Sequence, residues 1–250
     1  TVKLTKQVNI LRANSWCLLL NLRFAYFIKT TLNKTAKNIA VHTDKVKNEI
    51  SELTPYSNIL RIEHGFFFKE FKSESPKVKD NKCLMIGYIS KYKGIEDALD
   101  VIRILKEKGE EFTLDVIGLG DPEYLIILNE LISKYKIRDR VNILSREVST
   151  VFLINKIKQS TMLWLPYKNI NQSGVSYTSI GLNKPFVGYD VGNFKESFGD
   201  KGVANIVKKN NSEAFSNAVV EVAKNMNIYE ANISKLSSHN FWDSNRALLN

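Results

Sequence analysis

The chain has 250 residues, 44% of them hydrophobic and 25% charged, a composition typical of a globular protein with one large or two small domains. The formal net charge of +10 favours an anionic partner, such as nucleic acid, an anionic membrane surface or a phosphorylated substrate. The basic residues are spread along the chain, and neither an aromatic-basic RNA motif nor a zinc-finger spacing occurs, so we expect no nucleic-acid partner.

Cysteine usage and hydropathy indicate the compartment. Cys17 and Cys83 lie in separate apolar segments, which argues against a disulfide framework or a metal site and favours the reducing cytoplasm. No small-residue cleavage site follows residues 1–11, so no signal peptide is predicted. The apolar segment 15–28 is interrupted by polar residues and is shorter than the ~20 residues of a membrane span, so we interpret it as a buried or interfacial helix.

The N-terminal part of the chain predicts a small α/β unit. Hydrophobic periodicity predicts, in order, a long helix over 8–32, a strand over 38–41, a helix over 44–53 and a strand over 58–62. A polar, non-periodic stretch follows, with one proline. We therefore assign residues 1–68 to a first unit and residues 69–82 to a linker.

From residue 83 onward, short apolar runs alternate with amphipathic helices. The pattern predicts strands over 83–89, 112–117, 141–144, 162–165 and 186–188. It predicts helices over 94–108, from Asp121-Pro122-Glu123 onward, and over 148–158, 173–182 and 213–223. Strands that alternate with crossover helices imply a parallel sheet, so we assign residues 83–250 to an α/β domain with a Rossmann-like, doubly wound fold.

In such a sheet, ligands bind beyond the carboxyl ends of the strands, in the turns that lead into the helices. The first turn reads GYISKYKG, in which Gly87 would let a ligand approach the backbone. Lys91 and Lys93 stand at a helix N-terminus, where a positive charge is unfavourable unless an anion is bound between them. Two solvated surface lysines are the alternative interpretation.

Two further turns have features that suit a diphosphate. VIGLGD places Gly118 and Gly120 around a strand end, but it lacks the third glycine of the dinucleotide fingerprint, which disfavours an NAD enzyme. PYKNINQSG leads to a helix whose first N–H groups, at Gly174 and Val175, could bind an anion. Ser173 could equally be an ordinary helix N-cap. The occurrence of all three turns at one sheet edge favours a diphosphate site.

These motifs, taken in order, resemble the C-terminal domain of the retaining GT-B glycosyltransferases of glycosyltransferase family 4. The resemblance covers about residues 38–242 and is carried by an ordered set of short motifs. They are Gly87, Lys93-Gly94, Gly118-Leu119-Gly120, Pro166-Tyr167, Gln172-Ser173-Gly174, Lys184-Pro185, Asp190-Val191-Gly192 with Glu196, and Asn240-Phe241-Trp242.

The resemblance implies a nucleotide-sugar donor and no metal. It implies that Lys93 binds the diphosphate, that the N–H groups of Gly174 and Val175 also face it, and that Gly118 to Gly120 and the Arg146 turn flank the nucleoside. The candidate binding residues are thus Gly87, Lys91, Lys93, Gly118, Gly120, Arg146, Asn171, Gln172, Ser173, Gly174, Val175 and Thr178.

The chain departs from the family pattern in three ways. The arginine common in the first loop is absent, and Lys91 is the only cationic substitute nearby. The family's acidic pair is replaced by Asn171 and Ser179, with Thr178 beside the latter. By this resemblance we expect most of an acceptor domain to be missing from the chain, and with it the segment that would hold a catalytic base or an acceptor pocket. His42 and His64, in the part that remains, follow strand ends and are interpreted as structural histidines.

We therefore expect a retaining hexosyltransferase-type enzyme, active in cell-surface polysaccharide or lipopolysaccharide synthesis. Its acceptor is expected to be a saccharide or a lipid-linked molecule. The alternative is a non-catalytic nucleotide-sugar-binding subunit, which the lost acidic pair and arginine favour. The helix over 8–32 and the basic surplus are also consistent with a cytoplasmic protein that contacts an anionic membrane surface, although packing of this helix on the missing acceptor domain is the favoured interpretation.

Overall fold

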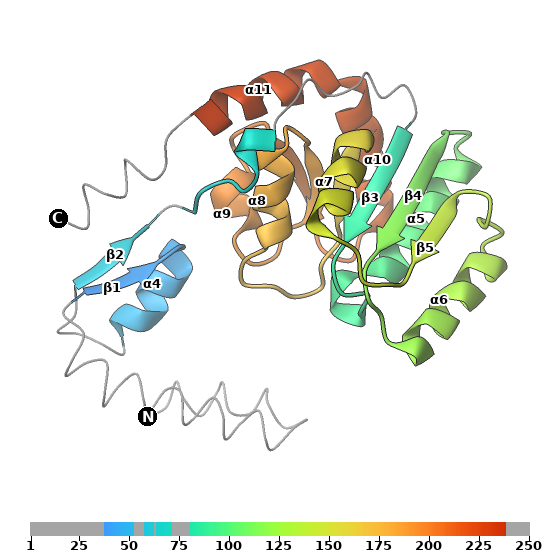
Figure 1. Ribbon diagram of the computed structural model, residues 1–250, viewed down its shortest axis with the longest axis horizontal. Helices are drawn as coiled ribbons and strands as arrows, with labels where there is room; N and C mark the ends of the chain where they lie inside the picture. Colours follow the sequence, from blue (N-terminus) through green and yellow to red (C-terminus); the bar gives the residue numbers. More distant parts are fainter. Residues whose placement is uncertain (1–37, 53–57, 63, 72–80, 239–250) are drawn as a thin grey trace. The chain divides into compact units, whose positions relative to one another are not determined.

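The computed structural model describes residues 38–52, 58–62, 64–71 and 81–238 (Figure 1). The helix expected over 8–32, the apolar segment 15–28 and the motif 240–242 lie outside these residues. The chain divides into two compact units, Thr1–His64 with Phe241–Asn250, and Gly65–Asn240. No helix within the described ranges has the length and apolar character needed to cross a membrane.

The described part of the smaller unit is a parallel two-stranded sheet with one helix. Strand β1 (Asn38–Val41) pairs with β2 (Asn58–Arg61), and α4 (Asp44–Ser51) connects them. Thr43 caps α4 by accepting a hydrogen bond from the Val46 N–H at 3.1 Å. The His42 ring lies 2.8 Å from the Ile62 carbonyl oxygen, through Nδ1, and 5.1 Å from the His64 ring centroid. These contacts fit a structural role for His42.

The larger unit contains a six-stranded sheet that is parallel throughout, with the strand order β5-β4-β3-β6-β7-β8. Within this sheet, the chain enters at the central strand β3 and continues outward through β4 to the edge strand β5. It then returns to the centre at β6 and continues through β7 to the opposite edge strand, β8. The order therefore reverses between β3 and β6. The strands are β3 (Asn81–Ile86), β4 (Phe112–Ile117), β5 (Val141–Leu144), β6 (Met162–Leu165), β7 (Phe186–Tyr189) and β8 (Ala204–Val207).

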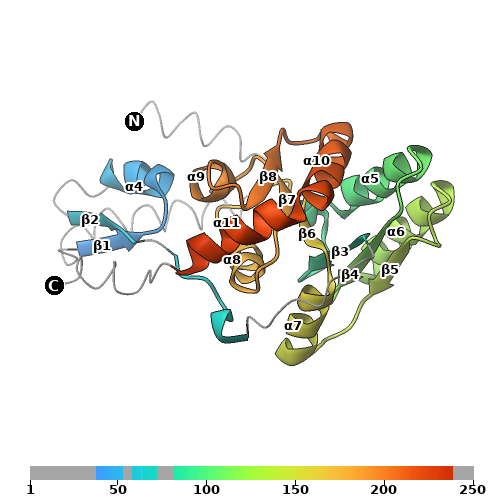
Figure 2. The same ribbon diagram turned by 90° about the horizontal axis from the view of Figure 1, so that it is seen from above.

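Helices cover both faces of this sheet (Figures 1 and 2). One core cluster joins one set of strand side chains to α5 (Ile95–Glu107), α6 (Pro122–Lys134) and α10 (Ser212–Lys224). The other joins the alternate strand side chains to α7 (Thr150–Gln159), α8 (Gly174–Gly181) and α9 (Phe194–Phe198). Helix α11 (Met226–Ser238) contributes side chains to both clusters. Strands buried on both faces explain the uninterrupted apolar runs in the sequence.

A short segment before the sheet belongs to the same unit. Residues 65–71 end in the 3-10 turn η2 (Lys69–Phe71), and their aromatic side chains pack along α8. The ring centroids of Phe66 and Tyr177 are 6.0 Å apart. A Cβ atom at Gly181 would lie 1.9 Å from the Phe67 carbonyl oxygen, so this approach requires glycine. The expected boundary at residue 68 thus falls inside a segment that packs on α8.

The expected doubly wound α/β fold is confirmed, and β4, β5 and β6 have the expected bounds. Strand β3 ends at Ile86 rather than residue 89, because Gly87 adopts a φ of 101° that leaves extended geometry. Among the α-helices and strands of the described residues, β8, α9 and α11 were not predicted, and neither were the 3-10 turns. Strand β8 is an edge strand with only one fully buried residue, and α9 has five residues, so neither has a clear hydrophobic period.

Leu99→Ala should lower the free energy of unfolding by about 2–5 kcal/mol, the range for deletion of a buried leucine side chain. Leu99 lies on α5 in the first core cluster and is 0% exposed. Ile126→Ala on α6, at a position 60% exposed, should change it by less than about 0.5 kcal/mol. Urea denaturation measures both values, and equal losses would contradict the placement of Leu99 in the core.

Candidate functional site

The loops after β3 and β4 meet at the carboxyl end of the sheet. The Ile89 N–H donates to the Leu119 carbonyl at 2.6 Å, and Ile89 forms a parallel bridge with Gly120. A Cβ atom on Gly118 would lie 2.1 Å from the Gly87 carbonyl oxygen. Because no side chain fits there, the glycines expected to let a ligand approach the backbone also let the two loops approach each other.

The loop after β6 packs against the loop after β3. Gly94 has a φ of 69°, and a Cβ atom there would lie 1.9 Å from the Pro166 carbonyl oxygen. The Lys168 N–H donates to the Tyr92 carbonyl at 2.7 Å. The Lys168 ammonium also pairs with Asp97 of α5. These contacts lie where the strand order reverses, which is where open parallel sheets bind ligands.

Lys93 lies at the centre of this arrangement, at the end of the 3-10 turn η3 (Lys91–Lys93). It is buried, with an exposed fraction of 8%. Its Nζ donates to the Tyr167 hydroxyl at 3.0 Å and to the Ile86 carbonyl oxygen at 3.3 Å, and it lies 4.5 Å from the centroid of the Tyr167 ring. Burial lowers the pKa of Lys93 from 10.5 to about 8.

Within the described part of the chain, Lys93 has no acidic partner, so its ammonium is desolvated but not neutralised by a carboxylate. A buried cation without a counter-ion is unfavourable. A Cβ atom added at Gly87 would lie 3.0 Å from the Lys93 Nζ, so the glycine leaves the ammonium accessible on that side. Ionisable groups in such unfavourable surroundings are concentrated at functional sites, so Lys93 is a candidate site residue.

The first turn of α8 offers backbone donors at the end of the same loop. Ser173 occupies the N-cap position, but its side chain makes no capping hydrogen bond to the helix. Gly174 is exposed and Val175 half-buried, while the Thr178 hydroxyl bonds back to the Gly174 carbonyl at 2.9 Å. The interpretation of Ser173 as an ordinary side-chain cap therefore does not describe this helix. Its N–H groups remain available to an anion.

The other predicted residues are more dispersed. Lys91 is exposed and lines a cavity of about 340 Å³ together with Tyr88, Ser90, Asp121, Glu123 and residues of α6. Lys91 and Lys93 thus face different surroundings, and the expectation that one anion lies between them is not met by the geometry. Both lysines belong to the 3-10 turn η3, at its first and last positions, and this turn exposes Lys91 and buries Lys93, which the sequence alone did not reveal.

Arg146, Asn171 and Gln172 lie in the loops around these donors. Arg146 is exposed after β5, with its guanidinium 5.9 Å from the Phe152 ring centroid. The backbone of Asn171 contacts the loop after β7, since a Cβ atom at Gly192 would lie 2.8 Å from the Asn171 carbonyl oxygen. Gln172 is half-buried beside Tyr177, in contact with a polar cluster that includes Asn193.

The sequence analysis placed Tyr167 in the Pro166-Tyr167 motif but not among the candidate binding residues, although its hydroxyl contacts Lys93. It is 1% exposed, burial raises its pKa, and the neighbouring Ser173 side chain acts in the opposite direction. The signal available in the sequence was a tyrosine that directly follows the buried strand β6 and Pro166. That position places a polar tip at the ligand-binding end of the sheet.

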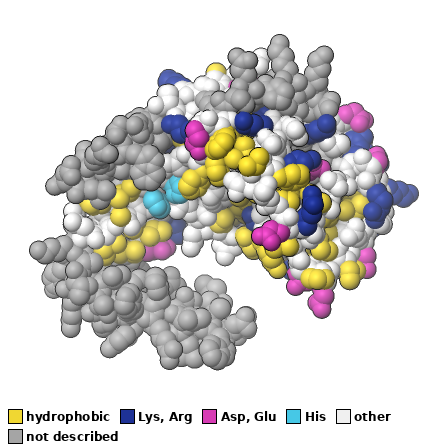
Figure 3. All heavy atoms as spheres, viewed as in Figure 1, with side chains coloured by type: hydrophobic (Ala, Val, Ile, Leu, Met, Phe, Trp, Pro, Cys, Tyr) yellow, Lys and Arg dark blue, Asp and Glu magenta, His cyan; other side chains and the backbone are white. Residues whose placement is uncertain are grey.

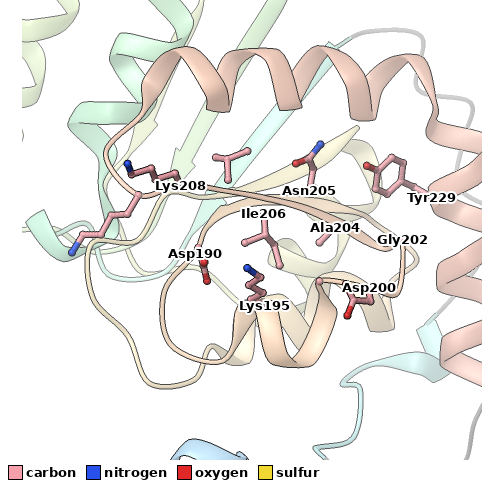
Figure 4. Close-up of a pocket in the computed structure, with 12 residues that line it drawn as sticks. Asp190, Lys195, Asp200, Gly202, Ala204, Asn205, Ile206, Lys208 and Tyr229 are labelled. Carbon is pink, nitrogen blue, oxygen red and sulfur yellow. The ribbon is translucent and has the colours of Figure 1, made fainter.

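A separate cavity of about 680 Å³ lies along the open edge of β8 (Figure 4). It is lined by Lys195, Lys208, Lys209 and Asp200, among others, and by none of the predicted binding residues. Lys195 lies on α9, and Lys208 and Lys209 directly follow β8, so basic side chains flank this edge of the sheet and discourage its pairing with another chain without a ligand. On the described part of the face in Figure 3, basic side chains are interspersed with acidic ones. Among the described residues, no group of His, Cys, Asp or Glu could hold a metal ion.

The family model described as "Glycosyl transferases group 1" matches residues 66–236. No curated protein matches the chain. Solved structures that resemble it include TarM of S. aureus, in complex with UDP among other molecules, at 13% identity and a TM-score of 0.66, covering 85% of this chain and 42% of TarM. HepE of Anabaena, in complex with UDP, has 13% identity and a TM-score of 0.69, and the match covers 83% of this chain and 59% of HepE. WaaG, a glycosyltransferase involved in lipopolysaccharide biosynthesis, has 15% identity and a TM-score of 0.62, and the match covers 80% of this chain and 58% of WaaG.

The parallel sheet with a reversal of strand order between glycine-rich loops defines a Rossmann-like domain, and the buried lysine and the N-terminus of α8 lie at its ligand-binding end. The chain belongs to the group 1 glycosyltransferases, the retaining GT-B enzymes of family 4, which use nucleotide-sugar donors. It spans about half the length of the solved structures it matches.

Lys93→Met should raise the free energy of unfolding at pH 7 by about 1–3 kcal/mol, since each pKa unit lost to burial corresponds to about 1.4 kcal/mol. The folded-state pKa of about 8 lies below the ordinary 10.5. The loss of unfolding free energy that burial of the Lys93 charge causes is therefore fully present below pH 8 and disappears as the pH rises towards 10.5.

Chemical denaturation at pH 7 and pH 10 measures this change, with Lys134→Met, at an exposed position of α6, as the control. A stability gain from Lys93→Met that is the same at both pH values would show that burial of the charge is not its cause.

Proposed function

We propose that the larger unit binds the donor of a sugar transfer, with the diphosphate of a nucleotide sugar between Lys93 and the N-terminus of α8. The observation that carries this proposal is the Lys93 ammonium, which is buried at the reversal of strand order and, among the described residues, donates hydrogen bonds only to a carbonyl and a phenol. A protein gains nothing in stability from such a group, so a function is the better explanation.

The chemistry follows from the charges. When the bond between the anomeric carbon and the diphosphate breaks, negative charge accumulates on the departing phosphate oxygens. A fixed ammonium and oriented N–H groups stabilise this charge more than they stabilise the intact donor, which lowers the barrier to transfer. Gly87, Gly118 and Gly120 allow a ligand close to the backbone, and Arg146, Asn171, Gln172 and Thr178 surround this position in the neighbouring loops.

The donor is proposed to be a UDP- or GDP-sugar and the acceptor a saccharide or a lipid-linked molecule, in the synthesis of a cell-surface polysaccharide or lipopolysaccharide. The UDP present in the TarM and HepE structures and the pathway of WaaG support this choice. The smaller unit is proposed to belong to the acceptor-binding domain. A cytoplasmic location with contact to an anionic membrane surface would suit a lipid-linked acceptor.

One observation favours a second function, donor binding without transfer. The positions where the family carries its acidic pair hold Asn171, Thr178 and Ser179. The Ser179 hydroxyl is buried and bonded to the Lys184 carbonyl at 2.8 Å, and the Thr178 hydroxyl is bonded within its own helix. Neither hydroxyl can replace a carboxylate. A transfer assay on the full-length protein, with labelled nucleotide sugars and a mixed acceptor pool, distinguishes the two functions, because only a transferase yields a glycosylated product.

UDP or GDP should raise the melting temperature of the chain, and NAD should not. A ligand at about a hundred times its dissociation constant adds about 2.7 kcal/mol to the free energy of unfolding. Lys93→Met should weaken diphosphate binding by about 1.5–3 kcal/mol, the range for a hydrogen bond with a charged group. Lys134→Met, at an exposed position of α6, serves as the matched control.

Thermal-shift titration and calorimetry measure these effects. The donor site is wrong if neither nucleotide shifts the melting temperature at millimolar concentration. Equal weakening by the two lysine substitutions would mean that general surface charge accounts for the binding.

A further inference from the structure

The Tyr167 side chain connects the two halves of the proposed diphosphate site. It directly follows Pro166 at the end of β6, and its ring packs among other aromatic rings, with centroids 5.9 Å from Phe194 and 6.3 Å from Tyr92. These contacts and its 1% exposure leave the ring no room to rotate away. The position of its hydroxyl is therefore fixed by the core.

The hydroxyl lies between two groups that come from different loops. On one side it accepts a hydrogen bond from the Lys93 Nζ at 3.0 Å. On the other side is Ser173, the residue that immediately precedes α8. The same ring faces the ammonium at 4.5 Å from its centroid, so Lys93 is held both by the phenol oxygen and by the aromatic face.

We propose that Tyr167 is a positioning residue of the donor site, which fixes the Lys93 ammonium at a set place relative to the N-terminus of α8. This inference rests on the proposed function. A lysine side chain has four rotatable bonds, and ordering it costs free energy whenever it binds a ligand. Contacts made before the ligand arrives remove part of that cost from binding.

The carbonyl of Ile86, at 3.3 Å, is the second contact that directs the ammonium. It belongs to the backbone of β3 and cannot be removed by substitution, whereas the phenol hydroxyl can. Loss of the hydroxyl leaves Lys93 with one hydrogen bond and lets it occupy other rotamers. It also removes an acceptor that favours the charged form of Lys93, so less of the ammonium form is present at a given pH.

The test is Tyr167→Phe, which keeps the ring and its packing. UDP affinity, measured by calorimetry, is expected to fall about fivefold to tenfold, equivalent to about 1–1.4 kcal/mol. The affinity for uridine, which has no phosphate, is expected to stay unchanged. The decrease of UDP affinity with rising pH is expected to begin at a lower pH than in the unaltered chain. Tyr229→Phe is the matched control, because it also removes a tyrosine hydroxyl, one that donates to the Glu221 carboxylate on α10 at 2.8 Å.

Combination with Lys93→Met makes the test specific. If Tyr167 acts through Lys93, Tyr167→Phe has no further effect on UDP binding in a chain that already carries Lys93→Met. The same loss in both backgrounds, or a parallel loss of uridine affinity, would overturn the inference by showing a general structural role. Unchanged UDP affinity in Tyr167→Phe would overturn it as well.

The outcomes also separate this inference from the proposed function. If the unaltered chain does not bind UDP or GDP, the donor site itself is wrong. If it binds and Lys93→Met weakens the binding while Tyr167→Phe does not, the donor site stands and only the role of Tyr167 is rejected.

Discussion

The site depends on one constraint, the burial of a lysine ammonium between a backbone carbonyl and a tyrosine ring without a neutralising carboxylate among its described contacts. Such a group destabilises the fold, and the surrounding structure must hold it in place. Gly94 provides the left-handed turn that ends η3, and its missing side chain lets Pro166 approach. The loop after β6 can then lie over Lys93 and bring Tyr167 to it.

A second layer of contacts holds that loop. The Lys168 ammonium pairs with Asp97 and bonds to Asn210 at 2.9 Å, and the Tyr189 hydroxyl donates to the same Asp97 carboxylate at 2.7 Å. The Asp97 carboxylate of α5 is thus shared by Lys168 of the loop after β6 and Tyr189 of β7, while Asn210 of the loop after β8 accepts a hydrogen bond from the Lys168 ammonium. Because Lys168 is adjacent to Tyr167, this network restricts the backbone that presents the phenol.

The sequence was sufficient to predict the sheet and the loops of the site, because strands buried on both faces and amphipathic helices leave strong patterns. Lys93 and the first turn of α8 could be selected for the same reason: they stand where strands end. The separation of Lys91 from Lys93 could not be predicted, since it depends on a 3-10 turn. Tyr167 was not chosen as a binding residue because its partner, Lys93, is distant in the sequence. Strand β8 was missed because its four residues are too few to show a hydrophobic period.

The contact between Lys93 and Tyr167 joins residues 74 positions apart. Strands β3, β4 and β5 form two consecutive βαβ units with local connections, whereas β6 must return past both of them to pair with β3. The loop-closure entropy of that return has to be overcome before any of its contacts form. During folding, the β3-β4-β5 half can therefore take shape with its glycine turns in place while the anion site is still absent, and docking of β6 is the step that creates it.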